Sequence, residues 1–291
     1  MIAFFLFWLA AGAVIGTILQ GRATGGSGQL GGAVAFAVLA VIAILWSYYA
    51  GAGTVLSMAG AQPADPGRYK VLHDVVEELA IGDGLPKPDV YVVDDPSPNA
   101  FATGRDPQHA AVTVTTGLLE TMDRRELQAV LGHELSHIKN LDVRLLLIVS
   151  TLIGLAALIA SLIWNFFPRV RFGGKNTGYV ILIILAIGLV FTIIAFVVGP
   201  LMQLALSRDR ESLADASGVQ LTRDPEGLIG ALRKLAASSA RPQRFNNATA
   251  AMWIDNPDEH HGRWFQRFFD THPPIEERIA ALERMLTVKE T

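Results

Sequence analysis

Charged residues are missing from four long stretches of this 291-residue chain. Residues 1–21, 23–64, 145–168 and 176–207 contain no Asp, Glu, Lys or Arg. A helix needs about 20 mainly apolar residues to cross a bilayer, and each stretch is long enough to do so. The pattern therefore predicts four transmembrane helices. Any chemistry is expected in the polar segments that lie between and after them.

Composition narrows the choice of function. The formal net charge is −3 and 51% of the residues are hydrophobic, which excludes a nucleic-acid binder and a disordered chain. No ionisable residue lies inside a predicted span, and this argues against a carrier or a proton pump. The chain has no cysteine, so a bound metal would have to be held by His, Asp or Glu.

The most informative motif lies just before the third apolar stretch. Asp123 and Glu126 form a capping box, which predicts the start of a helix. On this helix, His133 and His137 are four residues apart, so both imidazoles can reach one zinc ion. Glu134 follows the first histidine and can act as a general base toward water activated by the metal. The alternative is a chance match to a short pattern.

A catalytic zinc needs a third protein ligand. Glu211 is favoured because spans 145–167 and 179–206 form a hairpin that returns the chain to the side where the histidines lie. Asp215 lies one helical turn after Glu211 and is expected to orient an imidazole, that of His133. An exposed acidic helix face is the alternative. The candidates for the third ligand are Asp142, Glu211, Asp215, His73, His109, His260, His261 and His272.

Two short strands are expected before the histidine helix, at Asp89–Val93 and Ala111–Thr115, with an irregular stretch at Pro96–Gly104 between them. Ala111–Thr115 is interpreted as an edge to which an extended substrate adds, with an internal strand as the alternative. The segment Asn99–Ala102 either lines the cleft or is a simple turn. The residues assigned to the substrate cleft are Asn99, Ala100, Phe101, Thr113 and Val114.

His272 is the candidate for a second donor to the oxyanion that develops during hydrolysis. The two prolines after it predict the start of a helix over Ile275–Leu282 and keep the histidine backbone extended. Packing at a junction between a loop and a helix is the alternative.

Several motifs together resemble the HtpX family of membrane zinc endopeptidases. They occur in the matching order, with two spans before the histidine helix and two between it and the glutamate. The motifs are Asn99-Ala100-Phe101-Ala102-Thr103-Gly104, Val114-Thr115-Thr116-Gly117-Leu118-Leu119, His133–His137, Ser207-Arg208 with Glu211-Ser212-Leu213-Ala214-Asp215, and Thr271-His272-Pro273-Pro274 with Arg278.

The resemblance implies a mainly α, multi-pass membrane protein with four transmembrane helices and a small α+β zincin-like catalytic domain. It implies one Zn²⁺ per chain, held by His133, His137 and Glu211, with Glu134 as catalytic base. It also implies a plasma (inner) membrane protease that hydrolyses misfolded or damaged membrane proteins. The expected organisation is an N-terminal transmembrane hairpin (1–58), two halves of the catalytic domain (59–144 and 207–291) and a second hairpin (145–206).

Lys and Arg residues near the span ends are more numerous beside the polar segments than in the two turns, which favours a cytoplasmic catalytic domain. Two other functions are alternatives. A prenyl-protein endopeptidase uses the same zinc motif, but proteins of that type have about seven spans. A catalytically inactive membrane scaffold would not need Glu134. The expected partners are polypeptide substrates and the lipid bilayer, and no nucleic acid.

Overall fold

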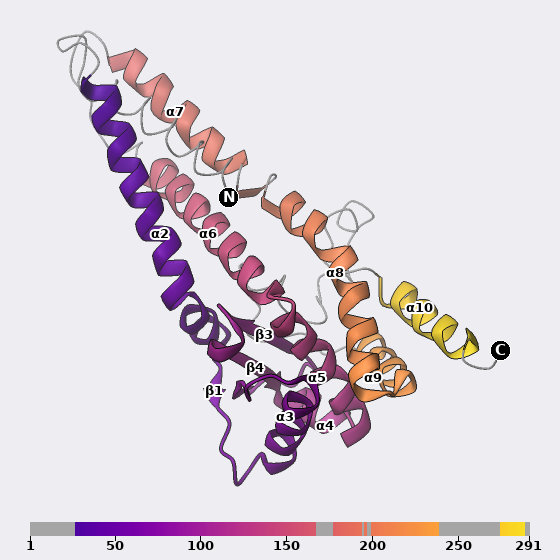
Figure 1. The fold of residues 1–291 in the computed structure, drawn as a ribbon. Coiled ribbons are helices and arrows are strands. Elements are labelled where there is room, and N and C mark those ends of the chain that lie inside the picture. Colours follow the sequence, from indigo (N-terminus) through magenta and orange to yellow (C-terminus); the bar gives the residue numbers. More distant parts are fainter. Residues whose placement is uncertain (1–26, 167–176, 194, 197–198, 239–273, 289–291) are drawn as a thin grey trace. The chain divides into compact units, whose positions relative to one another are not determined.

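The structure is a computed structural model, and it describes residues 27–166, 177–193, 195–196, 199–238 and 274–288 (Figure 1). The first predicted span and His272, as well as His260 and His261, lie outside the described residues. The chain divides into two compact units. One unit comprises residues 1–47 and 151–199, and the other comprises residues 48–150 and 200–291.

In the part of the first unit that the structure describes, segments of three long helices are present. They are the first part of α2 (Ser27–Ala59), most of α6 (Asp142–Phe166), and α7 (Thr177–Ile193). Helices α6 and α7 are in contact, because the indole Nε1 of Trp164 donates a hydrogen bond of 2.9 Å to the hydroxyl of Thr192. Among the described residues, no helix has the length and apolar character that a membrane crossing requires.

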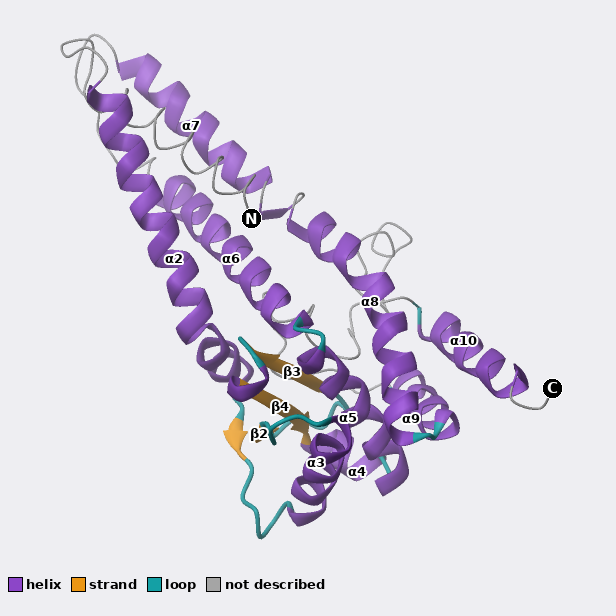
Figure 2. Cartoon of the chain, viewed as in Figure 1, coloured by secondary structure: helices purple, strands orange, loops and turns teal. Residues whose placement is uncertain are grey.

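The second unit is built on a four-stranded sheet, whose strand order is β1-β2-β4-β3. Its strands are β1 (Gln62–Pro63), β2 (Asp89–Val93), β3 (Ala100–Gly104) and β4 (Ala110–Thr115). Strands β2 and β4 are parallel, while β1 and β3 are antiparallel to their neighbours (Figure 2). The predicted strand at Asp89–Val93 is therefore confirmed, and the predicted strand at Ala111–Thr115 begins one residue earlier.

Two expectations about this sheet are wrong. Strand β4 lies inside the sheet, paired with β2 on one side and β3 on the other, so it is not an edge. The predicted irregular stretch 96–104 contains a strand, β3, at its end. Proline, asparagine and glycine around the short segment suggested a loop. However, its five residues are all buried, and pairing with β4 satisfies backbone groups that a buried loop would leave without partners.

The rest of the described part of this unit is largely helical. In the order of the chain, its helical elements include α3 (Lys70–Asp83), a 3₁₀ turn η2 (Pro107–His109), α4 (Thr116–Thr121), α5 (Arg124–Lys139), α8 (Gly199–Thr222), α9 (Pro225–Ala237) and α10 (Ile275–Val288). Helix α10 starts at the predicted residue. Helix α3 ends at Asp83, and Gly84 caps it with a φ of 68°, a left-handed conformation that a helix cannot continue through.

The two faces of the sheet are covered by different helices. Val112 and Val114 of β4 belong to the main core, together with Leu131 and Leu135 of α5. Phe101 points to the other face, where it belongs to a smaller cluster with residues of α2 and α6, namely Val55, Ala59 and Leu147. Because successive residues of a strand point to opposite faces, both faces of β3 are packed. This double packing fixes the strand next to the helix that carries the two histidines.

Candidate metal centre

Helix α5 carries the central motif and starts as the sequence predicts. The side chain of Asp123 accepts a hydrogen bond from the backbone N–H of Glu126, and the side chain of Glu126 accepts one from the backbone N–H of Asp123. His133, Glu134 and His137 are 1%, 2% and 8% exposed. Burial of two histidines and a glutamate is costly unless they are paired or bind a metal, so this face of α5 requires partners.

A close helix crossing brings those partners to α5. Gly132 of α5 and Gly218 of α8 lie against one another. A Cβ added at Gly218 would lie 3.0 Å from the backbone nitrogen of His133, and one added at Gly132 would lie 3.5 Å from the carbonyl oxygen of Gly218. The two glycines therefore let the backbones approach at this point, two turns beyond Glu211 on α8.

Glu211 lies between the two imidazoles. The Nε2 atoms of His133 and His137 are 3.2 Å apart, and the carboxylate oxygens of Glu211 lie 3.4 Å from each of them. These three donors lie together within 4.8 Å of one another and are all buried. Four ligands around zinc at about 2.05 Å stand about 3.3 Å apart in a tetrahedron. The spacing and the chemistry of the donors thus fit a metal ion with one position left open.

The Nδ1 atom of each imidazole, which faces away from Glu211, contacts an aspartate. Nδ1 of His133 lies 2.9 Å from Asp215, and Nδ1 of His137 lies 3.1 Å from Asp142. A proton on Nδ1 would be donated to the carboxylate, which leaves Nε2 free to bind a metal. Asp142 in turn is paired with Arg210. The expected pairing of Asp215 with His133 is present, whereas Asp142, a candidate ligand from the sequence, lies behind His137 instead.

A sharp turn after α5 places Asp142 there. Helix α5 ends at Lys139, Asn140 caps it, and Leu141 adopts a φ of 60°, which is uncommon for a residue other than glycine. The turn lets α6 begin at Asp142 in a new direction. One continuous helix through these residues would not bring Asp142 back to His137.

The electrostatics of the site favour cations. Burial alone would lower the pKa of His137, but the carboxylates of Asp142 and Glu211, with a smaller effect from Glu134, raise it to about 10. Burial would raise the pKa of Asp215, yet Arg278 and His133 hold it well below its usual range. The carboxylates therefore stabilise positive charge at His137, and they would stabilise a bound divalent cation at the same place.

The other candidate ligands lie elsewhere or have other roles. His73 on α3 makes a hydrogen bond of 3.0 Å with the backbone oxygen of Ala64, and His109 lies at the turn between β3 and β4, next to Asp106. The residues assigned to the substrate cleft are all buried. Asn99 directly precedes β3, the last strand of the sheet among the described residues, and Ala100 and Phe101 are its first two residues. Thr113 and Val114 lie within the internal strand β4.

Arg278 of α10 is an important residue of the site to which the sequence assigned no role. It is 3% exposed and reaches both Asp215 and Glu211. The only signal for it was its place after the Thr271–Pro274 motif. Spacing alone could not show that the last helix returns to the histidines.

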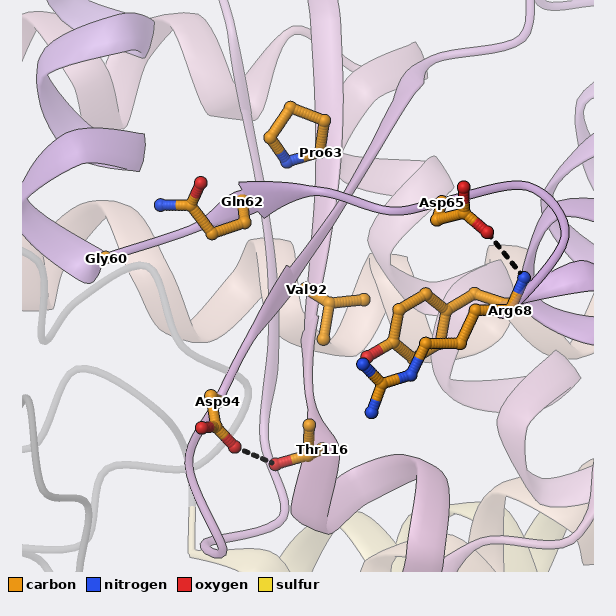
Figure 3. A pocket seen from close by; sticks show the side chains of 9 residues that line it. Gly60, Gln62, Pro63, Asp65, Arg68, Val92, Asp94 and Thr116 are labelled. Atoms are coloured by element: carbon orange, nitrogen blue, oxygen red, sulfur yellow. Dashed lines mark hydrogen bonds between the residues drawn. The ribbon is translucent and has the colours of Figure 1, made fainter.

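The second unit also has a cavity of about 460 Å³, and Figure 3 shows the side chains that line it. It is bounded by β1, by the segment that leads into α3, and by the ends of β2 and β4. Arg68 stacks on the ring of Tyr69 in its wall, and the hydroxyl of Thr116 lies 3.5 Å from Asp94. The cavity shares no residue with the His133, His137 and Glu211 cluster.

A buried pair of histidines on one helix, a glutamate on a second helix and a glutamate next to the first histidine define a metallopeptidase of the HExxH type. The comparisons with known proteins agree. Residues 66–286 match the model of Peptidase family M48. The chain belongs to this family, and it is a metallopeptidase.

Several curated relatives are named Protease HtpX homolog, and two of them serve as examples. The protein of Thermoanaerobacter pseudethanolicus is 44% identical over 263 residues, which are 87% of this chain and 86% of the relative. The protein of Streptococcus pneumoniae (strain Hungary19A-6) is 39% identical over 291 residues, covering 98% of this chain and 95% of the relative. The expected resemblance to the HtpX family is thereby confirmed.

A solved structure, the crystal structure of S. mikatae Ste24p, has a similar fold. It aligns with a TM-score of 0.51 and 20% identity over 96% of this chain. The chain spans 61% of the length of that protein. At this identity the likeness concerns the fold alone.

Proposed function

We propose that the protein is a zinc-dependent endopeptidase in which His133, His137 and Glu211 hold one Zn²⁺. The observation that carries the proposal is a set of distances among buried atoms: the two Nε2 atoms lie 3.2 Å apart, and each lies 3.4 Å from one carboxylate oxygen of Glu211. Ligands around a tetrahedral zinc have about this spacing. Asp215 and Asp142 support it, because they bind the nitrogens of the two imidazoles that do not face the cluster.

In this proposal the hydrolysis of a peptide bond depends on Glu134. When bound, zinc supplies Lewis acidity, which polarises the carbonyl group of the substrate and lowers the pKa of a water molecule. Glu134 accepts a proton from the attacking water and passes it to the amine that leaves. Its side chain is buried beside the ligands, so the carboxylate is shielded from bulk solvent, and proton transfer stays within the site. His272 is proposed as a further donor to the developing oxyanion.

The test uses the full-length protein purified in detergent. Zinc content is measured by elemental analysis, and cleavage is measured on an unfolded protein such as casein. Glu134→Ala should retain zinc and lose cleavage, whereas Glu211→Ala should lose zinc as well. Glu226→Ala is the matched control, since Glu226 is an exposed glutamate of α9. Equal zinc content in wild type and Glu211→Ala would contradict the ligand assignment.

We propose that the substrate binds in an extended form along β3. This strand has β4 as its one ladder partner among the described strands, so its second edge is the one to which a peptide can pair. Asn99, Ala100 and Phe101 lie at the start of that strand. Pairing through backbone groups recognises an extended chain more than a particular side chain, as suits an enzyme that cleaves unfolded segments.

We further propose that the protein is embedded in the plasma membrane, with the catalytic domain in the cytoplasm, and that it cleaves misfolded or damaged membrane proteins. The four charge-free stretches support the membrane proposal, with four spans. Large apolar side chains along α2 support it too: Leu30, Ile42 and Trp46 are 70%, 55% and 62% exposed, an exposure that suits contact with lipid better than with water.

Location and orientation have a separate test. Membranes washed with carbonate should retain the protein, and a phosphatase reporter fused after Thr291 should be inactive when the C-terminus is cytoplasmic. An active phosphatase at that position would reverse the proposed orientation. The alternative of a prenyl-protein endopeptidase gains no separate support, because the likeness to Ste24p establishes a shared fold only.

A further inference from the structure

Arg278 makes a buried ion pair beside the metal centre. It lies on α10 and is 3% exposed. Its Nη2 and Nε atoms donate hydrogen bonds of 2.7 and 2.9 Å to the two carboxylate oxygens of Asp215. Asp215 in turn lies 2.9 Å from Nδ1 of His133. A bidentate pair of this kind fixes the plane of the carboxylate, and so it fixes the direction in which the carboxylate meets the imidazole.

The third nitrogen of the guanidinium group points toward another member of the cluster. Nη1 of Arg278 lies 3.8 Å from Oε2 of Glu211, and it makes no hydrogen bond in the part of the chain that the structure describes. One side chain thus reaches both the partner of His133 and the third proposed ligand. Its positive charge also offsets the repulsion between two carboxylates that are one helical turn apart.

The arginine at the other histidine serves as a comparison. Arg210 pairs with Asp142 behind His137, but its side chain is 36% exposed, against 2% for Arg278. Solvent screens the Arg210 pair more strongly, so the loss of that arginine should matter less. Removal of Arg278 would leave a buried Asp215 without its charge partner, which is far more costly.

We propose that Arg278 is a positioning residue for the metal centre: it holds Asp215 and Glu211 in the orientation that metal binding requires. The centre is then complete only when α10 is docked on the rest of the domain. This inference rests on the proposed function, because it assumes that His133, His137 and Glu211 bind a metal.

The test measures metal binding without activity. Full-length protein is freed of metal with a chelator and titrated with Co²⁺, whose visible absorption reports the geometry of its ligands. Arg278→Lys and Arg278→Ala should bind Co²⁺ about 10- to 100-fold more weakly than wild type, with a changed spectrum. Arg210→Ala should show a smaller loss. Added guanidinium ion, but not urea, should partly restore the wild-type spectrum in Arg278→Ala.

Arg233→Ala is the matched control for the docking of α10. Arg233 on α9 pairs with Glu283 of α10 at 2.7 Å, and both side chains are at least half exposed. This variant should keep the Co²⁺ affinity and spectrum of wild type. If Arg278→Ala does not fold by circular dichroism, Arg278→Lys, which keeps the charge, provides the test.

The outcomes separate the two proposals. If wild type fails to bind one Co²⁺ per chain, the proposed function is wrong. If wild type binds Co²⁺ and the folded Arg278 variants bind it with the same affinity and spectrum, the inference about Arg278 is overturned. That inference is also overturned if Arg233→Ala weakens binding as much as Arg278→Ala does, since α10 docking alone would then explain the effect.

Discussion

Gly218 packs directly on the backbone of His133. A Cβ at position 218 would lie 3.0 Å from the amide nitrogen of His133 and 3.2 Å from its Cα. Contacts this short with a rigid helix backbone cannot be relieved by a side-chain rotation. The contact between these two residues therefore sets how closely α8, with Glu211, approaches the histidines.

Gly218→Ala should push α8 away from α5. We expect the free energy of unfolding to fall by about 1 to 3 kcal/mol, the usual cost of overpacking, and zinc to bind more weakly. Thermal unfolding and competition with a zinc chelator measure the two effects. Gly53→Ala is the control, because nothing lies within 4 Å of a Cβ at that position of α2. If Gly218→Ala leaves stability and zinc affinity unchanged, the prediction is wrong, because α5 and α8 can then accommodate the extra methyl group.

Asp142→Asn should weaken metal binding through His137. An amide at position 142 can still contact Nδ1, but it carries no charge to strengthen the bond from the imidazole N–H, and Arg210 loses its partner. We expect the apparent zinc affinity to fall about 10- to 100-fold. Asp74→Asn provides the control, since Asp74 pairs with Lys70 on the surface of α3. Equal zinc affinities for the two variants would argue against a role for Asp142.

Acid should destabilise the contact between α5 and α9. Hydrogen bonds from Arg125, partly opposed by burial, lower the pKa of Asp224 from its usual value. Asp224 also caps α9 through the N–H of Gly227. A depressed pKa means that this stabilisation is present above about pH 4, the pKa of an unfolded Asp, and is lost as the pH falls through the lower folded value.

Asp224→Asn removes that charge but keeps a side chain that can cap the helix. Wild type should therefore be more stable than the variant near pH 6, by less than about 1 kcal/mol because Arg125 is exposed, and the difference should shrink toward pH 3. Thermal unfolding of the chelated proteins between these pH values checks this. Asp89→Asn, at an exposed position of β2, should show no such trend. A stability difference between wild type and Asp224→Asn that grows as the pH falls would contradict the stabilising role of the Asp224 charge.

Arg223→Gly should stabilise the protein. Arg223 follows the last residue of α8, is exposed, and has a φ of 56°, a conformation in which glycine avoids the strain of a Cβ. We expect a gain of up to about 1 kcal/mol in the free energy of unfolding. Arg223→Ala should give no such gain, because alanine keeps the Cβ. A gain from alanine equal to that from glycine would point to the loss of the arginine charge instead.

The sequence predicted the parts of the site that depend on helical spacing. His133 with His137, and Glu211 with Asp215, are each four residues apart on a helix, and the structure places all four together. The capping box at Asp123 was equally local. These features follow from neighbours in sequence, and for this reason they could be recognised without a structure.

Features that depend on chain direction were not predictable in the same way. The left-handed turn at Leu141 brings Asp142 back to His137, although leucine is not a residue expected there. The strand at Ala100–Gly104 was hidden among proline, asparagine and glycine residues and becomes a strand through pairing with β4. Arg278 is separated from His133 by 145 positions, a distance over which spacing carries no information.

The 145 positions between His133 and Arg278 also determine when the site can form during biosynthesis. A ribosome that has just exposed the helix with His133 has yet to translate the helices with Glu211 and Arg278. On the proposed assignment, a nascent chain holds an unfinished centre until its last helix has emerged. On the same assignment, hydrolysis can start only after translation has passed Arg278.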